Sequence, residues 1–250
     1  MRAGTALAFL VLMAGSAPAA ADRLIASLST SDVKITSNFT GTSVTVFGAI
    51  ERDPGSPPRA ENPVIVVAVR GPPQTAIAWR KERWLGLWIN ASARTFPDAP
   101  AFYALHSSRP LAEAASAAEL ERYQIGIAHL ALGPPGATPD DFERAFIRLK
   151  EKAGLYSEQS GTIDMPGASI FQATVQIPAN VPVGLYTATV YLFENGAMVA
   201  RADSNFTIAK SGFEQFMFTL AHQRSLFYGV ATAVLALIVG WLAGVIFRRE

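Results

Sequence analysis

The chain has 250 residues, of which 21 are Lys or Arg and 20 are Asp or Glu, so its formal charge of +1 gives no electrostatic reason to bind nucleic acid. Charged residues make up only 16% of the sequence and hydrophobic residues 50%, a balance that indicates a membrane protein. Cysteine is absent, which excludes disulfides, thiol catalysis and thiolate metal sites.

The N-terminus, residues 1–21, has the pattern of a secretory signal peptide. Arg2 precedes an apolar run over residues 5–14, and alanines at positions 19–21 precede Asp22. The apolar run is too short to cross a bilayer, and the alanines fit an A-x-A cleavage site. We therefore predict an exported protein with cleavage near Ala21.

Strand patterns dominate from residue 22 to about residue 106. Apolar residues alternate with polar or small ones at residues 44–50, and residues 64–69 form a continuous apolar run. These patterns predict a half-buried strand and a strand buried on both faces. Residues 75–80 and 84–90 are typical of a hairpin that turns at residues 81–83.

The predicted hairpin carries three tryptophans and a basic cluster formed by Arg80, Lys81 and Arg83. Within one strand, Trp84 and Trp88 share a face. That face is either sandwich core or a protein interface or ligand groove, so we retain both tryptophans as possible interface residues. The basic cluster is either a solvated turn or a site for an anion or acidic partner.

The middle of the chain, about residues 107–155, is predicted to be a helical insertion. Ser108 is a candidate N-cap for an Ala-rich helix over residues 111–120. Thr138 is a candidate N-cap for a second helix, which Gly154 is placed to end. One face of this second helix is charged and is predicted to be solvated; it carries Glu143, Arg144, Arg148 and Glu151.

Strand patterns return after residue 160 and complete a mainly β fold. Apolar residues alternate over 171–177, and two strand-like runs flank Asn195-Gly196, a strong hairpin signal. Residues 182–186, PVGLY, resemble the strand start common in bacterial immunoglobulin-like domains. We predict one immunoglobulin-like β-sandwich over residues 22–210; two smaller domains are the alternative.

Residues 211–225 are predicted to form an amphipathic juxtamembrane helix that begins with a capping box at Ser211 and Glu214. Its apolar face either packs on the sandwich, lies among lipid headgroups, or contacts a partner. The residues of this face are Phe213, Phe216, Met217 and Leu220.

Residues 226–247 are predicted to form one transmembrane helix. The segment has no charged residue, and at about 1.5 Å per residue it gives about 33 Å of helix, enough to cross a ~30 Å hydrocarbon core. Arg248 and Arg249 follow, which predicts a cytoplasmic tail at residues 248–250. Small residues at every fourth position permit close contact with a membrane-protein partner or a second copy; they are Thr232, Ala236, Gly240 and Gly244.

No recognisable motif for catalysis, a cofactor or a metal occurs, so we predict no catalytic residue, no cofactor and no metal. The histidines, His106, His129 and His222, are too far apart in sequence for a histidine metal motif. Ser31 and Lys34 match S-x-x-K, but they lie in a strand pattern, where the two side chains point to opposite faces.

Several runs of the chain resemble the Alph_Pro_TM family of transmembrane proteins from α-proteobacteria. The runs are WRKER (79–83), GLWIN (86–90), FYA (102–104), SSRPL (107–111), GFEQF (212–216) and GWLAGVIFRR (240–249). The resemblance covers almost the whole mature chain and implies a periplasmic domain on the inner membrane. The family has no established activity, so the resemblance implies no catalytic residue. It does imply an accessory role beside an exporter of anions or sulfite.

Together, these observations predict a non-catalytic accessory subunit of a membrane complex. We expect it at the inner membrane, with its N-terminal domain in the periplasm and its C-terminus in the cytoplasm. The alternative is a tethered ligand- or ion-binding domain, whose site is the tryptophan face or an acidic loop containing Glu51, Asp53 and Glu61. An enzyme is the third class.

Overall fold

The computed structural model describes residues 23–51, 63–130, 132–133, 139–167, 169–212 and 225–247. Three predicted segments lie wholly or mostly outside the described residues. They are the signal peptide (1–21), the amphipathic helix (211–225) with its apolar face, and the tail (248–250).

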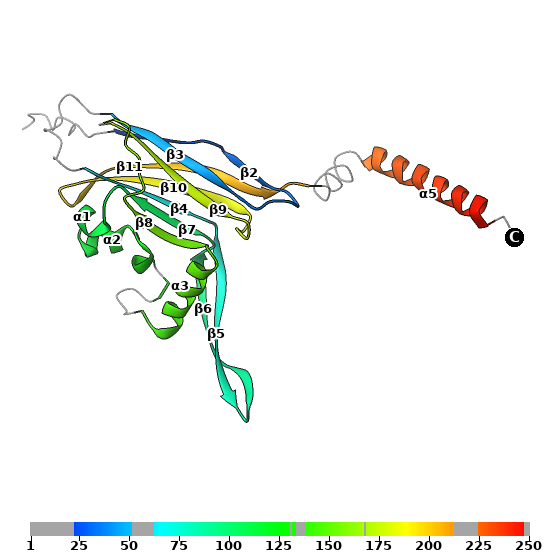
Figure 1. Cartoon of the computed structure of the whole chain (residues 1–250), viewed down its shortest axis with the longest axis horizontal. Coiled ribbons are helices and arrows are strands. Elements are labelled where there is room, and N and C mark those ends of the chain that lie inside the picture. Colours follow the sequence, from blue (N-terminus) through cyan, green and yellow to red (C-terminus); the bar gives the residue numbers. More distant parts are fainter. Residues whose placement is uncertain are drawn as a thin grey trace, which may run out of the picture.

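Among the described residues, nine strands form two sheets that pack face to face (Figure 1). The first sheet has the order β1-β3-β9, with β1 Arg23–Leu28, β3 Gly41–Glu51 and β9 Ile170–Pro178. The second sheet has the order β2-β11-β10-β4-β7-β8. Its strands are β2 Asp32–Ile35, β11 Ala197–Lys210, β10 Gly184–Glu194, β4 Val64–Arg70, β7 Tyr103–Ser107 and β8 Tyr156–Ser160.

The first hydrophobic core fills the space between these sheets. The alternation predicted over residues 171–177 is confirmed, because the four apolar side chains of this run are at most 1% exposed; they are Phe171, Ala173, Val175 and Ile177. They pack in one cluster with Val44 and Val46 of β3 and with apolar residues of β4, β10 and β11. Fully burying such a side chain contributes about 1.5–3 kcal/mol, which makes this core the main stabilising element.

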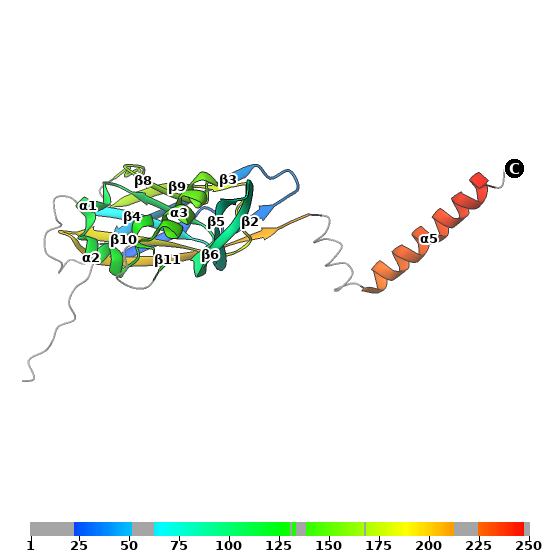
Figure 2. The ribbon, with the colours of Figure 1, turned by 90° about the horizontal axis from the view of Figure 1, so that it is seen from below.

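The other face of the six-stranded sheet is covered by the helices that lie between β7 and β8 (Figures 1 and 2). They are α1 Leu111–Ala114, α2 Ala117–Arg122, the 3-10 helix η1 Ile127–His129, and α3 Asp141–Lys152. These helices form a second core with β4, β7 and β8. Strand β4 therefore has a core on each face, and its residues 64–69 are at most 3% exposed, as predicted.

The first predicted helix is broken into two. Ser116 begins α2, because its side chain accepts a hydrogen bond from the Glu119 backbone N–H at 3.3 Å. Ser108 does not cap a helix, contrary to the prediction. Its hydroxyl instead accepts a hydrogen bond from the Ile65 backbone N–H at 3.1 Å, which ties the start of the insertion to β4.

The second predicted helix exists as α3, but Asp140 caps it. The Asp140 carboxylate accepts a hydrogen bond from the Glu143 backbone N–H at 2.9 Å, whereas the predicted cap, Thr138, lies outside the described residues. Glu143 was expected on the solvated face and is instead only 9% exposed. Gly154 follows the C-cap Ala153 with φ +70°, which confirms the predicted end of the helix.

Strands β10 and β11 form the predicted hairpin. Its turn residues, Asn195 and Gly196, have φ of +51° and +82°, the left-handed conformation that a type I′ turn needs. At the start of β10, the ring of Tyr186 is fully buried and its hydroxyl donates a hydrogen bond to the Pro182 carbonyl. This bond fixes the loop that leads into β10.

A separate two-stranded sheet, which we call the arm, projects away from the two packed sheets (Figure 1). It consists of β5 Pro73–Trp84 and β6 Leu87–Pro100. Its turn is Leu85-Gly86, with φ of +47° and +87°, so the predicted turn at residues 81–83 is wrong. Glycine adopts positive φ without steric cost, and Gly86 therefore sets the turn, while residues 81–83 continue β5.

The last described element is α5, Ser225–Phe247. For α5, the structure describes the side chains of residues 228–230 and 232–244. Within the described part of the chain, no helix is long and apolar enough to cross a membrane.

Candidate functional site

The end of the arm exposes a group of large apolar side chains. We call residues 84–89 the tip. The exposed fractions are 64% for Trp84, 83% for Leu85, 69% for Leu87, 69% for Trp88 and 41% for Ile89. The sandwich-core interpretation of the tryptophans is therefore wrong, and the interface interpretation stays a prediction.

The cross-strand register assigns the tip side chains to two faces of the arm. Trp84 pairs with Leu87, and Arg83 pairs with Trp88. Directly paired residues share a face and successive residues alternate, so Trp84 and Trp88 lie on opposite faces. The expectation that they share one face is wrong, because the turn places them on different strands. Apolar side chains thus lie on both faces of the tip and at its turn.

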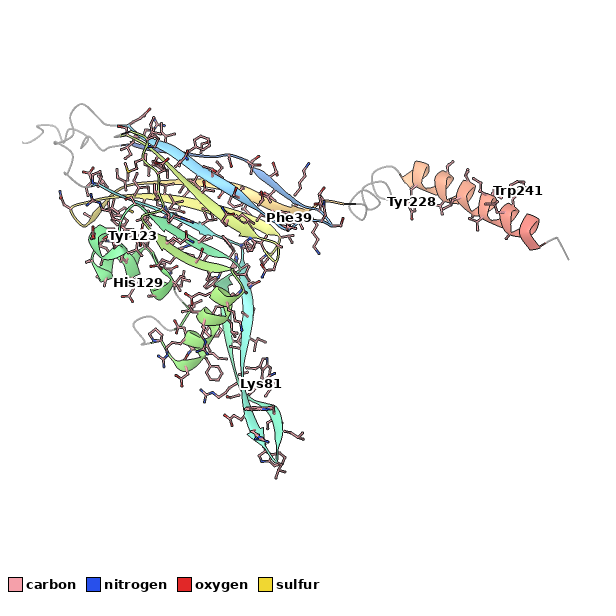
Figure 3. The ribbon with its side chains drawn as sticks, in the orientation of Figure 1. Phe39, Lys81, Tyr123, His129, Tyr228 and Trp241 are labelled. Carbon is pink, nitrogen blue, oxygen red and sulfur yellow. The ribbon has the colours of Figure 1, made fainter. Side chains whose placement is uncertain are left out.

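Two cations lie directly behind the tip. Arg83 and Lys81 precede Trp84 by one and three residues, on the same face of the arm as Trp88. The ion pairs found among the described residues include neither cation. Lys81 lies on the part of the arm that extends beyond the body (Figure 3). The arm therefore has an apolar end followed by two cations on one face and by the carboxylate of Glu82 on the other.

The opposite end of the arm, its root, is locked to α3. Phe96 of β6 stacks on Phe146 of α3 with 4.7 Å between ring centroids, and both rings are buried. Arg94 of β6 donates a hydrogen bond to the Asp140 carboxylate that caps α3. The backbone N–H of Glu143, together with Arg94, holds the pKa of Asp140 below its usual range.

Arg80 marks the end of this packed part of the arm. Its guanidinium lies 3.8 Å from the Asp141 carboxylate and 4.8 Å from the centre of the Phe142 ring. Beyond Arg80, every residue from 81 to 90 is exposed. The root is thus part of the folded body, and the tip makes no contribution to either core.

A second feature is a cavity of about 460 Å³ beside the root, lined by three arginines: Arg70, Arg122 and Arg201. Each guanidinium already has a partner. Arg70 donates to the Tyr123 carbonyl at 3.3 Å, Arg122 lies 3.7 Å from Glu119, and Arg201 lies 3.0 Å from Asp203. One feature of the sequence is consistent with this cavity, since Thr187 and Thr189 interrupt the apolar β10 on one face.

A comparison with protein-family models finds a match over residues 23–249 to the family described as "Putative transmembrane protein (Alph_Pro_TM)". The chain belongs to the Alph_Pro_TM family. The match covers nearly all of the predicted exported chain and confirms the resemblance carried by the six sequence runs. The family description associates the chain with a membrane. No curated protein matches the chain.

The small-residue positions of this Alph_Pro_TM chain lie on α5 and are exposed; they are Thr232, Ala236, Gly240 and Gly244. The Thr232 hydroxyl donates a hydrogen bond to the Tyr228 carbonyl one turn earlier, at 2.8 Å. The backbone carbonyl thus satisfies the Thr232 hydroxyl, which needs no further partner. We call these four positions the small-residue stripe. The predicted partner face of the amphipathic helix, with Phe213, Phe216, Met217 and Leu220, lies outside the described residues.

The structure describes two of the three histidines, His106 and His129. His106 is buried in β7 and its Nδ1 lies 2.8 Å from the Thr162 hydroxyl, while His129 ends η1 and His222 lies outside the described residues. Burial lowers the pKa of His106. The described residues contain no cluster of three or more metal-ligating side chains. Of the acidic loop, Asp53 and Glu61 lie outside the described residues.

Proposed function

We propose that this protein is a single-span membrane protein and an accessory subunit of a membrane complex. Its function in this proposal is to bind a partner and not to catalyse a reaction. The family description supports membrane association. Residues 226–247 supply an uncharged segment of about 33 Å if wholly helical, and α5 covers this range. The resemblance to the family points to a transport protein, such as an anion or sulfite exporter, as the partner.

The proposed topology places the β-rich domain in the periplasm. A signal peptide at residues 1–21 delivers the N-terminal side outward, and Arg248 and Arg249 favour the cytoplasm for the tail. We further propose that the sandwich is immunoglobulin-like. The hydrogen bond from the Tyr186 hydroxyl back to the Pro182 carbonyl supports this, because such tyrosine corners recur in that fold.

The observation that carries the contact function is the exposed arm, whose partner is either a protein of the complex or the membrane itself. Seven large apolar side chains of the arm and its turn are exposed: Ile77, Trp79, Trp84, Leu85, Leu87, Trp88 and Ile89. Ordering these residues costs conformational entropy, and the tip recovers none of it by packing in the described body. An exposed apolar patch of this kind marks an interaction surface.

The small-residue stripe of α5 is the proposed contact inside the membrane. Helices approach closely only where side chains are small, and packing there replaces the hydrophobic effect that lipid does not provide. Gly240→Leu with Gly244→Leu keeps the segment apolar but fills the stripe. The matched control is Ile238→Phe with Leu242→Phe, which adds bulk to the opposite side of the helix.

The test is affinity purification of the full chain from native membranes in mild detergent, read by mass spectrometry. A membrane protein recovered with wild type and control, but lost with the double-leucine variant, supports the proposal and identifies the partner. Equal recovery with all three chains contradicts the stripe as a contact. Recovery of the chain from the soluble fraction contradicts the proposed anchor.

A second candidate function, binding of a small anion, is favoured by the arginine cavity. Its lining combines three guanidinium groups with the hydroxyls of Thr187 and Thr189. The existing partners of the arginines weaken the attraction, so binding is expected to be modest. Sulfate and phosphate should raise the melting temperature of wild type more than that of Arg122→Gln; equal shifts contradict this function.

A further inference from the structure

We propose that the tip of the arm docks on the surface of the same membrane that holds the C-terminal apolar segment, with lipid as its partner. The inference rests on the proposed anchoring and identifies the surface that the arm contacts. It follows from where the arm leaves the body, how far it reaches, and the order of its side chains.

The arm and the chain that leads to the anchor leave the body at the same end. Ile208, near the end of β11, pairs with Gly184, the first residue of β10. Gly184 in turn lies against Pro72, which precedes β5, since a Cβ built on Gly184 would be 2.7 Å from the Pro72 Cγ. The root of the arm and the exit of β11 are therefore neighbours.

The lengths of the two segments are compatible. Strand β5 has 12 residues, which at about 3.3 Å per residue gives an arm of about 40 Å. Residues 211–225 supply at most about 50 Å of chain between β11 and the proposed span. The tip can therefore reach the bilayer surface while the anchor stays inserted.

The side chains of the arm follow the depth profile of a bilayer surface. Leu85 is at the turn, and Trp84 and Trp88 follow on opposite faces. Tryptophan favours the interface between headgroups and acyl chains. Arg83 and Lys81 lie about 3 Å and 10 Å behind Trp84 along the strand, within the depth at which cations meet lipid phosphates.

The distribution of apolar surface favours lipid over a protein partner. The tip is apolar on both faces and at its turn, so a protein needs a closed socket to cover it. Lipid surrounds an inserted hairpin from every side without such a socket. The two cations add charge complementarity on the face that carries Trp88, since anionic headgroups attract each lysine or arginine near the surface; Glu82 lies on the opposite face and leaves this segment with a net positive charge.

The four tryptophans of the chain allow a direct test, because three lie on the arm, namely Trp79, Trp84 and Trp88, and the fourth, Trp241, lies in α5. Full chains that retain one tryptophan each, with phenylalanine at the other three positions, are placed in nanodiscs. The lipid is phosphatidylcholine brominated near the headgroup, with or without phosphatidylglycerol. Bromine quenches only tryptophans that enter the acyl region.

We expect quenching and blue-shifted emission for the chains that retain Trp84 or Trp88. The chain that retains Trp79, about 17 Å behind Trp84 along β5, should keep water-exposed, unquenched emission. Removing charge by Lys81→Gln and Arg83→Gln should lower the ratio of docked to free arm about fivefold per charge in phosphatidylglycerol discs. Arg148→Gln, at an exposed position of α3, removes one positive charge from the body as a control and should change nothing.

The outcomes separate this inference from the proposed anchoring. If the emission of the chain that retains Trp241 is not quenched, the proposed anchor itself is wrong. Quenching of Trp241 without quenching of Trp84 and Trp88 overturns the inference alone. Blue-shifted but unquenched Trp84 and Trp88 also overturn it, because the tip is then covered by protein, a second copy included.

Discussion

The stacking of Phe96 on Phe146 predicts that the root of the arm and α3 are energetically coupled. The rings lie 4.7 Å apart at an interplanar angle of 24°, and the side chains are 0% and 5% exposed. Replacing either with leucine removes the ring but keeps most of the apolar volume, so each change should cost about 1–1.5 kcal/mol. Because both changes remove the same ring contact, the double variant should cost less than the sum by about 0.5–1 kcal/mol.

The measurement is urea unfolding of residues 22–210, followed by circular dichroism. Phe171→Leu provides the control partner, since Phe171 is equally buried but belongs to the first core. The cost of Phe96→Leu with Phe171→Leu should add to within about 0.3–0.5 kcal/mol. A Phe96–Phe146 double variant that is equally additive would refute the argument that this stack locks the root.

Three further predictions concern the body of the protein. The fragment 22–210 should be soluble and unfold cooperatively, and a chelator should not change its melting temperature; chelator-induced unfolding would reveal an ion site. Gly184→Ala should cost about 1–3 kcal/mol, because Gly184 has φ +145° and a Cβ there meets Pro72; Gly167→Ala, which meets nothing, should be nearly neutral. Burial lowers the pKa of His106 in the folded protein, so below about pH 6.5 the unfolded chain binds more protons than the folded one. The free energy of unfolding should therefore fall as the pH drops, and His106→Gln should make this fall smaller.

Hydrophobic periodicity was sufficient to predict strands β3, β4, β9, β10 and β11, but it did not predict β8, Tyr156–Ser160, which lies before the predicted return of strands after residue 160. The alternation over residues 171–177 and the continuous run over residues 64–69 report how many faces of each strand are covered, and the burial of β9 and β4 agrees. The Asn195-Gly196 turn was equally predictable from the sequence, because its positive φ values require specific residue types. These features depend on local sequence alone.

The arm was not predictable in the same way. Alternation over residues 75–90 indicates strands, but it does not tell whether a second layer covers them. Tryptophan is usually well buried, which favoured core for Trp84 and Trp88. The turn at Leu85-Gly86 then placed these two residues on different strands and opposite faces, beyond the reach of a single-strand pattern.

The start of α3 and the arginine cavity depend on tertiary contacts. Thr138 and Asp140 are both acceptable caps by sequence, and Asp140 is also held by Arg94 from β6. The cavity gathers side chains from β4, α2, β10 and β11. Sequence spacing does not show that such distant segments meet, so neither feature was open to pattern analysis.

The structure separates the stability of the arm from its surface chemistry. A two-stranded hairpin is marginally stable alone, and each of its strands has an open edge that invites unwanted pairing. Here the root carries the stabilising contacts of Phe96, Arg94 and Arg80, while residues 81–90 contact neither core. Substitutions in the tip therefore alter what the arm binds with little effect on the body. Because the tip gains nothing from packing in the described body, its exposed apolar residues support the proposed contact function.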